Sequence, residues 1–118
     1  MKINILGTKY KIITRKISED EIMSKNNWAG YCAEDAKTIV IADTSEERYF
    51  PDMTEKEKKT YIKKIIRHEI VHAFLNESGL SVNTSTPACG WAKHEEMIDW
   101  IAIQFPKMQK AFKKAGAL

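Results

Sequence analysis

The segment TEKEKKTYIKKIIRHEIVHAFLNESG, residues 54–79, carries the clearest structural signal in the chain. Thr54 and Glu57 have the spacing of a capping box, in which each side chain accepts a hydrogen bond from the backbone N–H of the other residue. Gly79 supplies the left-handed conformation that commonly stops a helix. The segment therefore predicts one long helix, from about Thr54 to Ser78.

The expected helix has a polar arc and an apolar surface. The polar arc consists of Lys56, Lys59, Thr60, Lys63, Lys64 and Arg67. The apolar surface consists of Tyr61, Ile62, Ile65, Ile66, Ala73 and Phe74. Because Ile70, Val71 and Phe74 make the second half apolar nearly all round, we expect that half to be buried.

The chain before this helix predicts two β-hairpins. In residues 2–16, apolar residues alternate with polar ones on both sides of a turn at Gly7 and Thr8. Residues 30–42 contain a polar turn followed by a β-branched run, which is the clearest strand signal in the chain. Residues 18–27 favour a short helix or an irregular loop, and residues 43–52 favour a surface connection.

The chain after the long helix predicts a loop and further helical structure. Residues 80–90 are rich in Ser, Asn and Thr and include Pro87, as a loop should. A helix is expected from about Trp91 to Phe105, because apolar residues recur there at the spacing of one buried stripe. Pro106 should end or bend this helix, and residues 107–115 can form a last short one.

Composition indicates one folded domain over residues 1–118, with 43% hydrophobic and 30% charged residues. The net charge of +3 is too small to indicate a nucleic-acid-binding protein. Neither a secretory signal nor a membrane-spanning segment is apparent, so we expect a cytoplasmic protein. Cys32 and Cys89 lack the spacing of a metal knuckle, and we expect both to be small buried apolar side chains.

Residues 68–72 read His68-Glu69-Ile70-Val71-His72, an HExxH motif inside the expected helix. At about 3.6 residues per turn, the two imidazoles project from one face and can bind a single metal ion. Glu69 points away from that face, yet it can reach a water held by the metal and act as general base and acid. The competing interpretation is that these are packing or surface residues, but a buried pair of imidazoles with a carboxylate would be costly without a metal.

Catalytic zinc needs three protein ligands, so a third must come from outside the motif. Glu95 and Asp99 share one face of the downstream helix, and Ile98 directs that face toward the core. We expect Glu95 to ligate the metal and Asp99 to hydrogen-bond a ligand imidazole. His94 and Glu96 remain alternatives for the third ligand.

With Glu95 and Asp99 fitting an E-x-x-x-D pattern after the HExxH motif, the chain resembles the gluzincin metallopeptidases. It is most similar to the minimal zincin domains of phages and prophages, relatives of the ImmA/IrrE-like and SprT-like peptidases. This resemblance covers roughly residues 61–105. It implies a zincin-like α+β fold, with a small twisted antiparallel or mixed sheet packed on the HExxH helix and a second ligand-bearing helix.

In such a fold an edge strand aligns the substrate peptide over the metal, and residues 38–42 are the natural candidate for that strand. Zincins often add a Tyr or His that stabilises the oxyanion. Four residues of the chain are candidates for this role, and no motif selects among them: Tyr31, Tyr49, Tyr61 and His94.

These observations predict a zinc-dependent metallopeptidase of phage or prophage origin in the host cytoplasm, with Zn²⁺ held by His68, His72 and Glu95. Its partner would be a peptide or protein substrate, with no membrane and no nucleic acid involved. An alternative is a non-catalytic zinc-binding protein that docks a host or phage partner. A less favoured alternative is a basic nucleic-acid accessory protein.

Two further groups of residues favour structural roles. Trp28, Trp91 and Trp100 could line a cleft, but aromatic residues beside helices more often belong to the core or its rim. The basic residues of the C-terminal stretch, with Met108 and Phe112, favour a docked or frayed terminal helix over a membrane or nucleic-acid contact. The basic residues are Lys107, Lys110, Lys113 and Lys114.

Overall fold

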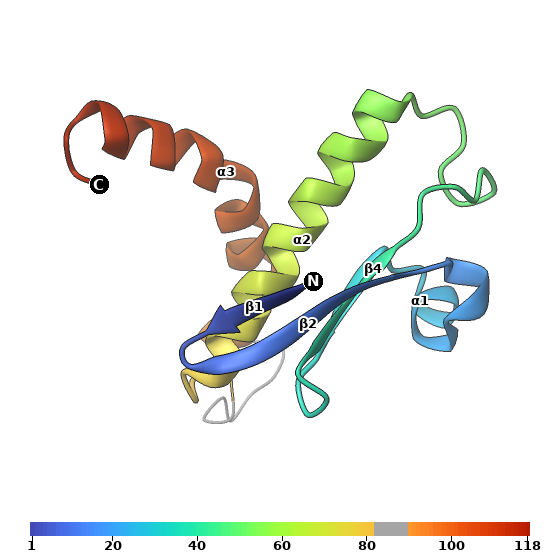
Figure 1. Cartoon of the computed structure of the whole chain (residues 1–118), viewed down its shortest axis with the longest axis horizontal. Helices are drawn as coiled ribbons and strands as arrows, with labels where there is room; N and C mark the ends of the chain where they lie inside the picture. The colour runs from blue at the N-terminus through green and yellow to red at the C-terminus, as the bar shows by residue number, and fades with distance from the viewer. Residues whose placement is uncertain (82–89) are drawn as a thin grey trace.

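A four-stranded mixed sheet and a long helix form the body of this α+β fold (Figure 1), seen in a computed structural model that describes residues 1–81 and 90–118. The elements, in chain order, are β1 (Lys2–Ile5), β2 (Thr8–Arg15), a 3₁₀ turn (Ile17–Glu19), α1 (Glu21–Asn26), β3 (Gly30–Ala33), β4 (Thr38–Ala42), α2 (Glu55–Glu77), a 3₁₀ turn (Trp91–Lys93) and α3 (Glu95–Lys114). Within the described ranges, no helix is long and apolar enough to cross a membrane.

The strands follow the order β1-β2-β4-β3, so both predicted hairpins are confirmed. The central pair, β2 and β4, is parallel, with Ile12 opposite Ile39, and the connection between the two hairpins passes through α1. The prediction that residues 38–42 form an edge strand is wrong, because β4 is hydrogen-bonded on both sides. The edge beside β4 is β3, residues 30–33.

β4 lies in the centre of the core because both of its faces are covered. Ile39 and Ile41 pack with Tyr10 and Ala73 beneath α2. Val40 belongs to a second cluster on the opposite face, together with Ile17, Met23, Ala42 and Phe50. Alternation of side chains along a strand explains how one short apolar run fills both clusters.

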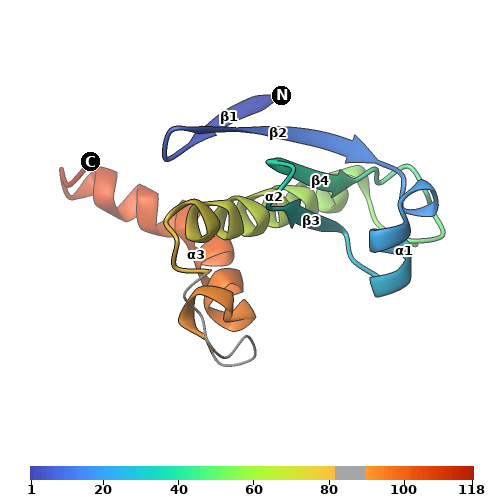
Figure 2. The same cartoon turned by 90° about the horizontal axis from the view of Figure 1, so that it is seen from below.

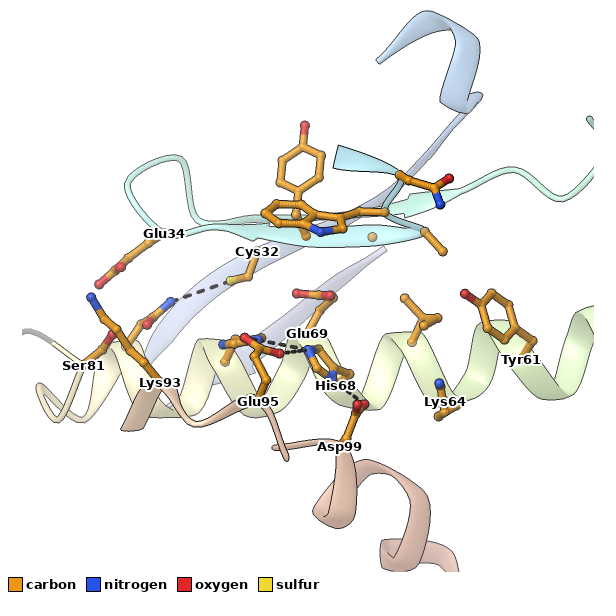
Figure 3. Close-up of a pocket in the computed structure, with 18 residues that line it drawn as sticks. Cys32, Glu34, Tyr61, Lys64, His68, Glu69, Ser81, Lys93, Glu95 and Asp99 are labelled. Atoms are coloured by element: carbon orange, nitrogen blue, oxygen red, sulfur yellow. Dashed lines mark hydrogen bonds and ion pairs between the residues drawn. The ribbon is translucent and has the colours of Figure 1, made fainter. Parts of the chain in front are cut away.

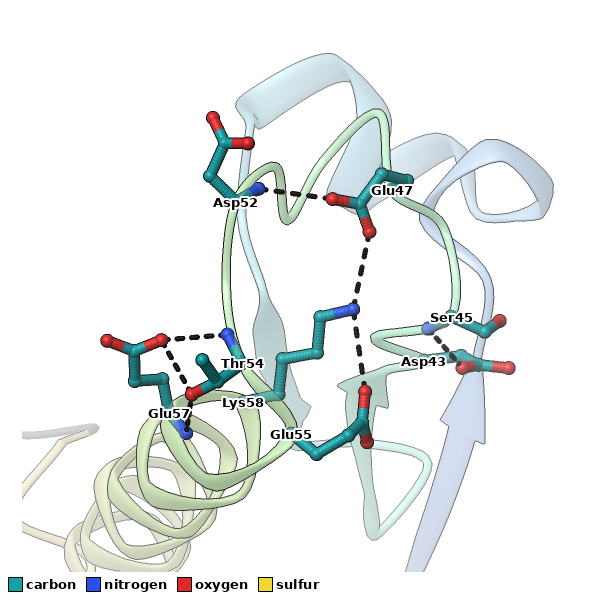
Figure 4. A network of polar contacts seen from close by, with 8 residues as sticks. All are labelled: Asp43, Ser45, Glu47, Asp52, Thr54, Glu55, Glu57 and Lys58. Atoms are coloured by element: carbon teal, nitrogen blue, oxygen red, sulfur yellow. Dashed lines mark hydrogen bonds and ion pairs between the residues drawn. The ribbon is translucent and has the colours of Figure 1, made fainter.

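The start of α2 is fixed by the predicted capping box (Figure 4). Thr54 Oγ1 accepts a hydrogen bond from the Glu57 N–H at 3.2 Å, and Glu57 Oε2 accepts one from the Thr54 N–H at 2.7 Å. Just inside this end, the buried Lys58 Nζ lies 3.4 Å from Glu47 Oε2 and 3.8 Å from Glu55 Oε1. The side chain of Lys58 is thus paired rather than solvated.

At the end of α2 the structure agrees with the predicted position of the helix stop and differs from the predicted burial. Gly79 follows the helix with a φ of +79°, the left-handed value expected there. Phe74 is 42% exposed, so the prediction that the second half of the helix is buried all round is wrong at that position. Most of the predicted 80–90 loop, including Pro87, lies outside the described residues, as does Cys89.

α3 is one continuous helix through Pro106, so the prediction of a separate short helix over residues 107–115 is wrong. Proline has no N–H to donate to Ala102, and the carbonyl oxygen of Ala102 instead accepts a hydrogen bond from Arg67 Nε. α3 packs against α2 on the side away from β1 and β2, and its C-terminal part leaves the body (Figure 2). Phe112 in that part is 43% exposed, so the terminal stretch is helical but not docked.

Candidate metal centre

The two histidines of the HExxH motif project together from α2 into a pocket bounded by β3 and the start of α3 (Figure 3). Their Nε2 atoms are 3.1 Å apart, although the side chains lie one helical turn from each other. Burial lowers the pKa of His72 below its ordinary value of 6.5, which favours the neutral imidazole that a metal requires. The two ring nitrogens therefore converge, as the four-residue spacing of the motif predicted.

Glu95, the first residue of α3, brings a carboxylate to this pair. Its Oε2 lies 3.1 Å from His68 Nε2, and its Oε1 lies 3.2 Å from His72 Nε2. The alternative ligands lie elsewhere: the imidazole of His94 caps α3 by accepting from the Met97 N–H, and Glu96 is exposed outside the cluster. Of the three candidates, the structure brings Glu95 to the histidines.

The three residues fit a metal ion by their chemistry and their spacing. Two imidazole nitrogens and a carboxylate oxygen are donors that zinc accepts, and ligands about 2.1 Å from a tetrahedral ion would be about 3.4 Å apart. The separations of 3.1 and 3.2 Å in this cluster are close to that value. His68, His72 and Glu95 can therefore hold a metal ion, as the distances among all their donor atoms also allow.

Asp99 lies one turn along α3 from Glu95 and contacts the far side of the His68 ring. Its Oδ1 is 3.0 Å from His68 Nδ1. A proton on Nδ1 would be donated to this carboxylate and would leave the Nε2 lone pair directed toward the cluster. The structure thus places Asp99 where the sequence predicted.

Glu69 is buried next to the cluster of His68, His72 and Glu95 but is not part of it. Its carboxylate lies between α2 and β3 and faces the pocket (Figure 3). Burial, with additional repulsion from Glu95 and Asp99, raises the pKa of Glu69 from 4.5 to about 8. No hydrogen bond to this carboxylate is found among residues 1–81 and 90–118, so nothing in that part of the chain fixes it in the charged form.

The pocket around these residues has a volume of about 640 Å³ and follows β3 on one side and α2 on the other. Gly30 brings the two walls together, because a Cβ at this position would lie 2.8 Å from Ile65 Cγ2. Cys32 lines the pocket, and burial raises the pKa of its thiol to about 12, so it is a neutral side chain and no nucleophile.

Some of the lining residues are only weakly indicated by the sequence. Trp28 lines the pocket and is 50% exposed, so it takes the cleft position that ranked below the core or its rim in the prediction. Trp91 and Trp100 are also more than half exposed. Tyr61 and Lys64 line the pocket as well, and their spacing from His68 on one helix was the signal that could have identified them.

The candidates for oxyanion stabilisation separate in the structure. The hydroxyl of Tyr31 donates to Asp20 Oδ2 at 2.9 Å, and Tyr49 packs in the cluster on the other face of the sheet. His94 caps α3, as described above. Tyr61 lines the pocket, and burial, followed by the negative charge of Asp99, raises the pKa of its hydroxyl.

Comparison of the chain with protein-family models, with curated protein sequences and with solved structures found no significant match.

Proposed function

We propose that the protein is a zinc-dependent metallopeptidase of the zincin type. The observation that carries the proposal is the convergence of His68, His72 and Glu95, with the buried carboxylate of Glu69 facing the same pocket. A set of three ligands is typical of catalytic zinc, whereas structural zinc sites have four protein ligands. Glu69 accepts no hydrogen bond from residues 1–81 and 90–118, and its burial raises its pKa, so its carboxylate is suited to accepting and releasing a proton.

In this mechanism the three ligands hold the ion and Asp99 orients the ring of His68. When bound, zinc supplies Lewis acidity, which lowers the pKa of a water molecule and polarises the scissile carbonyl. Glu69 takes a proton from the attacking water on one carboxylate oxygen and then passes it to the nitrogen of the leaving amine. The burial of Glu69 keeps its proton affinity high enough for both transfers.

The substrate peptide would bind in extended form along β3. This strand pairs with β4 on one side, and no strand pairs with its other side in the part of the chain that the structure describes. Unpaired N–H and C=O groups on such an edge can add a peptide as a further strand. β3 therefore replaces residues 38–42 as the proposed docking edge, and it lines the same pocket as Glu69.

The test compares zinc binding with peptide cleavage in one pair of variants. We expect the purified protein to bind one zinc ion per chain by metal analysis and to cleave a peptide library, as detected by mass spectrometry. Glu69→Gln should retain the zinc and lose cleavage, whereas Glu96→Gln, on the exposed start of α3, should keep both. Cleavage that survives in Glu69→Gln would contradict the mechanism, and zinc binding without any cleavage would favour the partner-docking alternative.

A further inference from the structure

The pocket has two ends that differ in charge (Figure 3). At one end, Glu34 and Lys93 bring opposite charges to the same region. At the other end, Lys64 lies beside Tyr61, and Trp28 is part of the same lining. The metal cluster lies between the two ends, so a peptide along β3 would pass both.

Among the residues that the structure describes, Lys64 differs from the other lysines that are at least partly buried, because it has no carboxylate partner there. Lys58, on the same helix, lies within 4 Å of two glutamates, and Lys37 pairs with Glu77. Lys64 is partly buried, and no ion pair involves it within residues 1–81 and 90–118. Its Nζ instead lies over the ring of Tyr61, 5.3 Å from the centroid.

Two carboxylates of the site, those of Glu95 and Asp99, are already engaged. Asp99 contacts His68 Nδ1, and both oxygens of Glu95 contact the histidine Nε2 atoms. The ammonium group of Lys64 is therefore a cation in a pocket wall, held beside an aromatic ring and available to an anion from outside. Aromatic walls reduce the access of water and strengthen a charge pair formed between them.

The position of Lys64 relates it to the reaction. It precedes His68 by one helical turn, which is about 6 Å along the helix axis. An extended peptide advances about 3.3 Å per residue. The side chain that meets Lys64 therefore belongs to a residue within about two positions of the scissile bond.

We propose that Lys64 is a specificity-determining residue that binds a carboxylate of the substrate, so that the enzyme prefers an acidic side chain on the Tyr61 side of the cleaved bond. This inference rests on the proposed peptidase function and adds the substrate class to it. Tyr61 packs against the aliphatic part of the bound Asp or Glu, and Lys64 pairs with its charge. A free C-terminal carboxylate offers the same chemistry and is separated from a side-chain carboxylate in the test.

The first experiment maps cleavage sites of the zinc-loaded protein in a peptide library. Acidic residues should be enriched within two positions of the cleaved bonds. Matched peptides with Glu, Gln or Lys at that position and an amidated C-terminus should show a preference for Glu of about tenfold in kcat/KM. A Gln peptide with a free C-terminus that is preferred equally would assign Lys64 to terminal carboxylates and overturn the side-chain proposal.

The second experiment changes the charge of the subsite. Lys64→Gln should abolish the preference for Glu over Gln, and Lys64→Glu should reverse it toward Lys. Lys63→Gln changes an exposed residue that directly precedes Lys64 on α2 and lies outside the pocket lining. This variant should keep the original preference. An unchanged preference in Lys64→Glu would overturn the inference and leave the peptidase proposal intact.

A binding measurement separates failure of the inference from failure of the enzyme proposal. Zinc-loaded Glu69→Gln protein is titrated with the fluorescent Glu and Gln peptides, with and without Lys64→Glu. If the unmodified protein cleaves nothing but this variant binds the Glu peptide through Lys64, the peptidase proposal fails and the subsite stands. If the peptides are neither bound nor cleaved, both proposals fail.

Discussion

Glu69 and Glu77 lie on the same helix and have opposite environments. The carboxylate of Glu77 accepts hydrogen bonds from Thr8 Oγ1 at 2.7 Å, Tyr10 OH at 2.8 Å and Lys37 Nζ at 2.5 Å. These donors, with Lys37 the strongest, lower its pKa from 4.5 to about 2. Burial, followed by the negative charges of Glu95 and Asp99, raises the pKa of Glu69 to about 8.

The two carboxylates differ because hydrogen-bond donors dominate the environment of Glu77, whereas burial dominates that of Glu69. Glu77 has only 13% of its side chain exposed, and Glu69 is 6% exposed. Three donors keep Glu77 charged, and it joins the end of α2 to the first hairpin. Burial, followed by the negative charges of Glu95 and Asp99, makes Glu69 hold a proton readily, as a general base in the proposed site must.

The largest expected effect is a contrast between two matched variants, in each of which one of the two glutamates is changed to glutamine. Glu69→Gln should reduce kcat/KM for peptide cleavage by about 10²- to 10⁴-fold, because it removes proton transfer. Glu77→Gln should keep most of the activity and lower the midpoint of thermal unfolding, because the Lys37 ammonium loses its counter-charge. Activity assays and thermal scans on both variants test this contrast. A Glu77→Gln variant that is less active than the Glu69→Gln variant would contradict it.

A second, smaller effect concerns the negative charge beside Glu69. Asp99→Asn should weaken zinc binding by about 10- to 100-fold, because the His68 ring loses the carboxylate that orients it. Competition with a chelator measures this affinity. The same change should lower the pKa of Glu69 in the metal-free protein, since Asp99 is one of the charges that raise it. Unaltered zinc affinity would show that Asp99 does not support the ligand.

The pH dependence of stability should have opposite signs for the two carboxylates in the metal-free protein. Glu69 titrates at about 4.5 when unfolded and about 8 when folded, so its contribution is full below pH 4.5 and is lost as the pH rises toward 8. Glu77 titrates at about 2 when folded, so its contribution is present above pH 4.5 and is lost as the pH falls toward 2.

Urea unfolding at a series of pH values measures these slopes. Glu69→Gln should flatten the decline of the unfolding free energy between pH 5 and 8. Saturating zinc should also reduce this decline, because a cation favours the charged carboxylate. Glu77→Gln should flatten only the acidic side. A metal-free Glu69→Gln variant with the full decline would assign that slope to other groups.

The smallest effect is expected from a single donor of Glu77. Tyr10→Phe removes a buried hydroxyl that donates to a charged acceptor, which should cost about 1.5–3 kcal/mol of unfolding free energy. Thr8→Ala, at the more exposed donor, is the matched control and should cost less. Urea denaturation of both variants measures the difference, and equal losses would mean that burial does not strengthen the Tyr10 bond.

Local signals in the sequence predicted much of this structure. The capping box at Thr54, the glycine stop at Gly79 and both hairpins depend on neighbouring residues, and all are present in the fold. The convergence of His68 and His72 also follows from helical periodicity alone. Glu95 and Asp99 contact His68 only because α3 packs against α2, which the sequence does not show directly. Their shared helical face was nevertheless enough to select them.

Features that depend on long-range pairing were not predictable in the same way. The strand at residues 38–42 has the strongest β signal because it is buried on both faces, which is a property of a central strand rather than an edge. The continuity of α3 through Pro106 depends on Arg67, a residue of another helix, which bonds to the carbonyl that proline leaves free. The sequence allows a cleft position for Trp28 but does not select it, because the approach of β3 to α2 places the residue there.

The absence of a side chain at Gly30 has a consequence for the molecule's tolerance of change. At this point β3 lies close to both α2 and β4, since an added methyl group would also lie 3.0 Å from the Val40 carbonyl oxygen. Any larger residue at position 30 would require its neighbours to shift. In the proposed peptidase, such a shift would alter the spacing between the peptide-binding strand and the helix that carries His68 and His72.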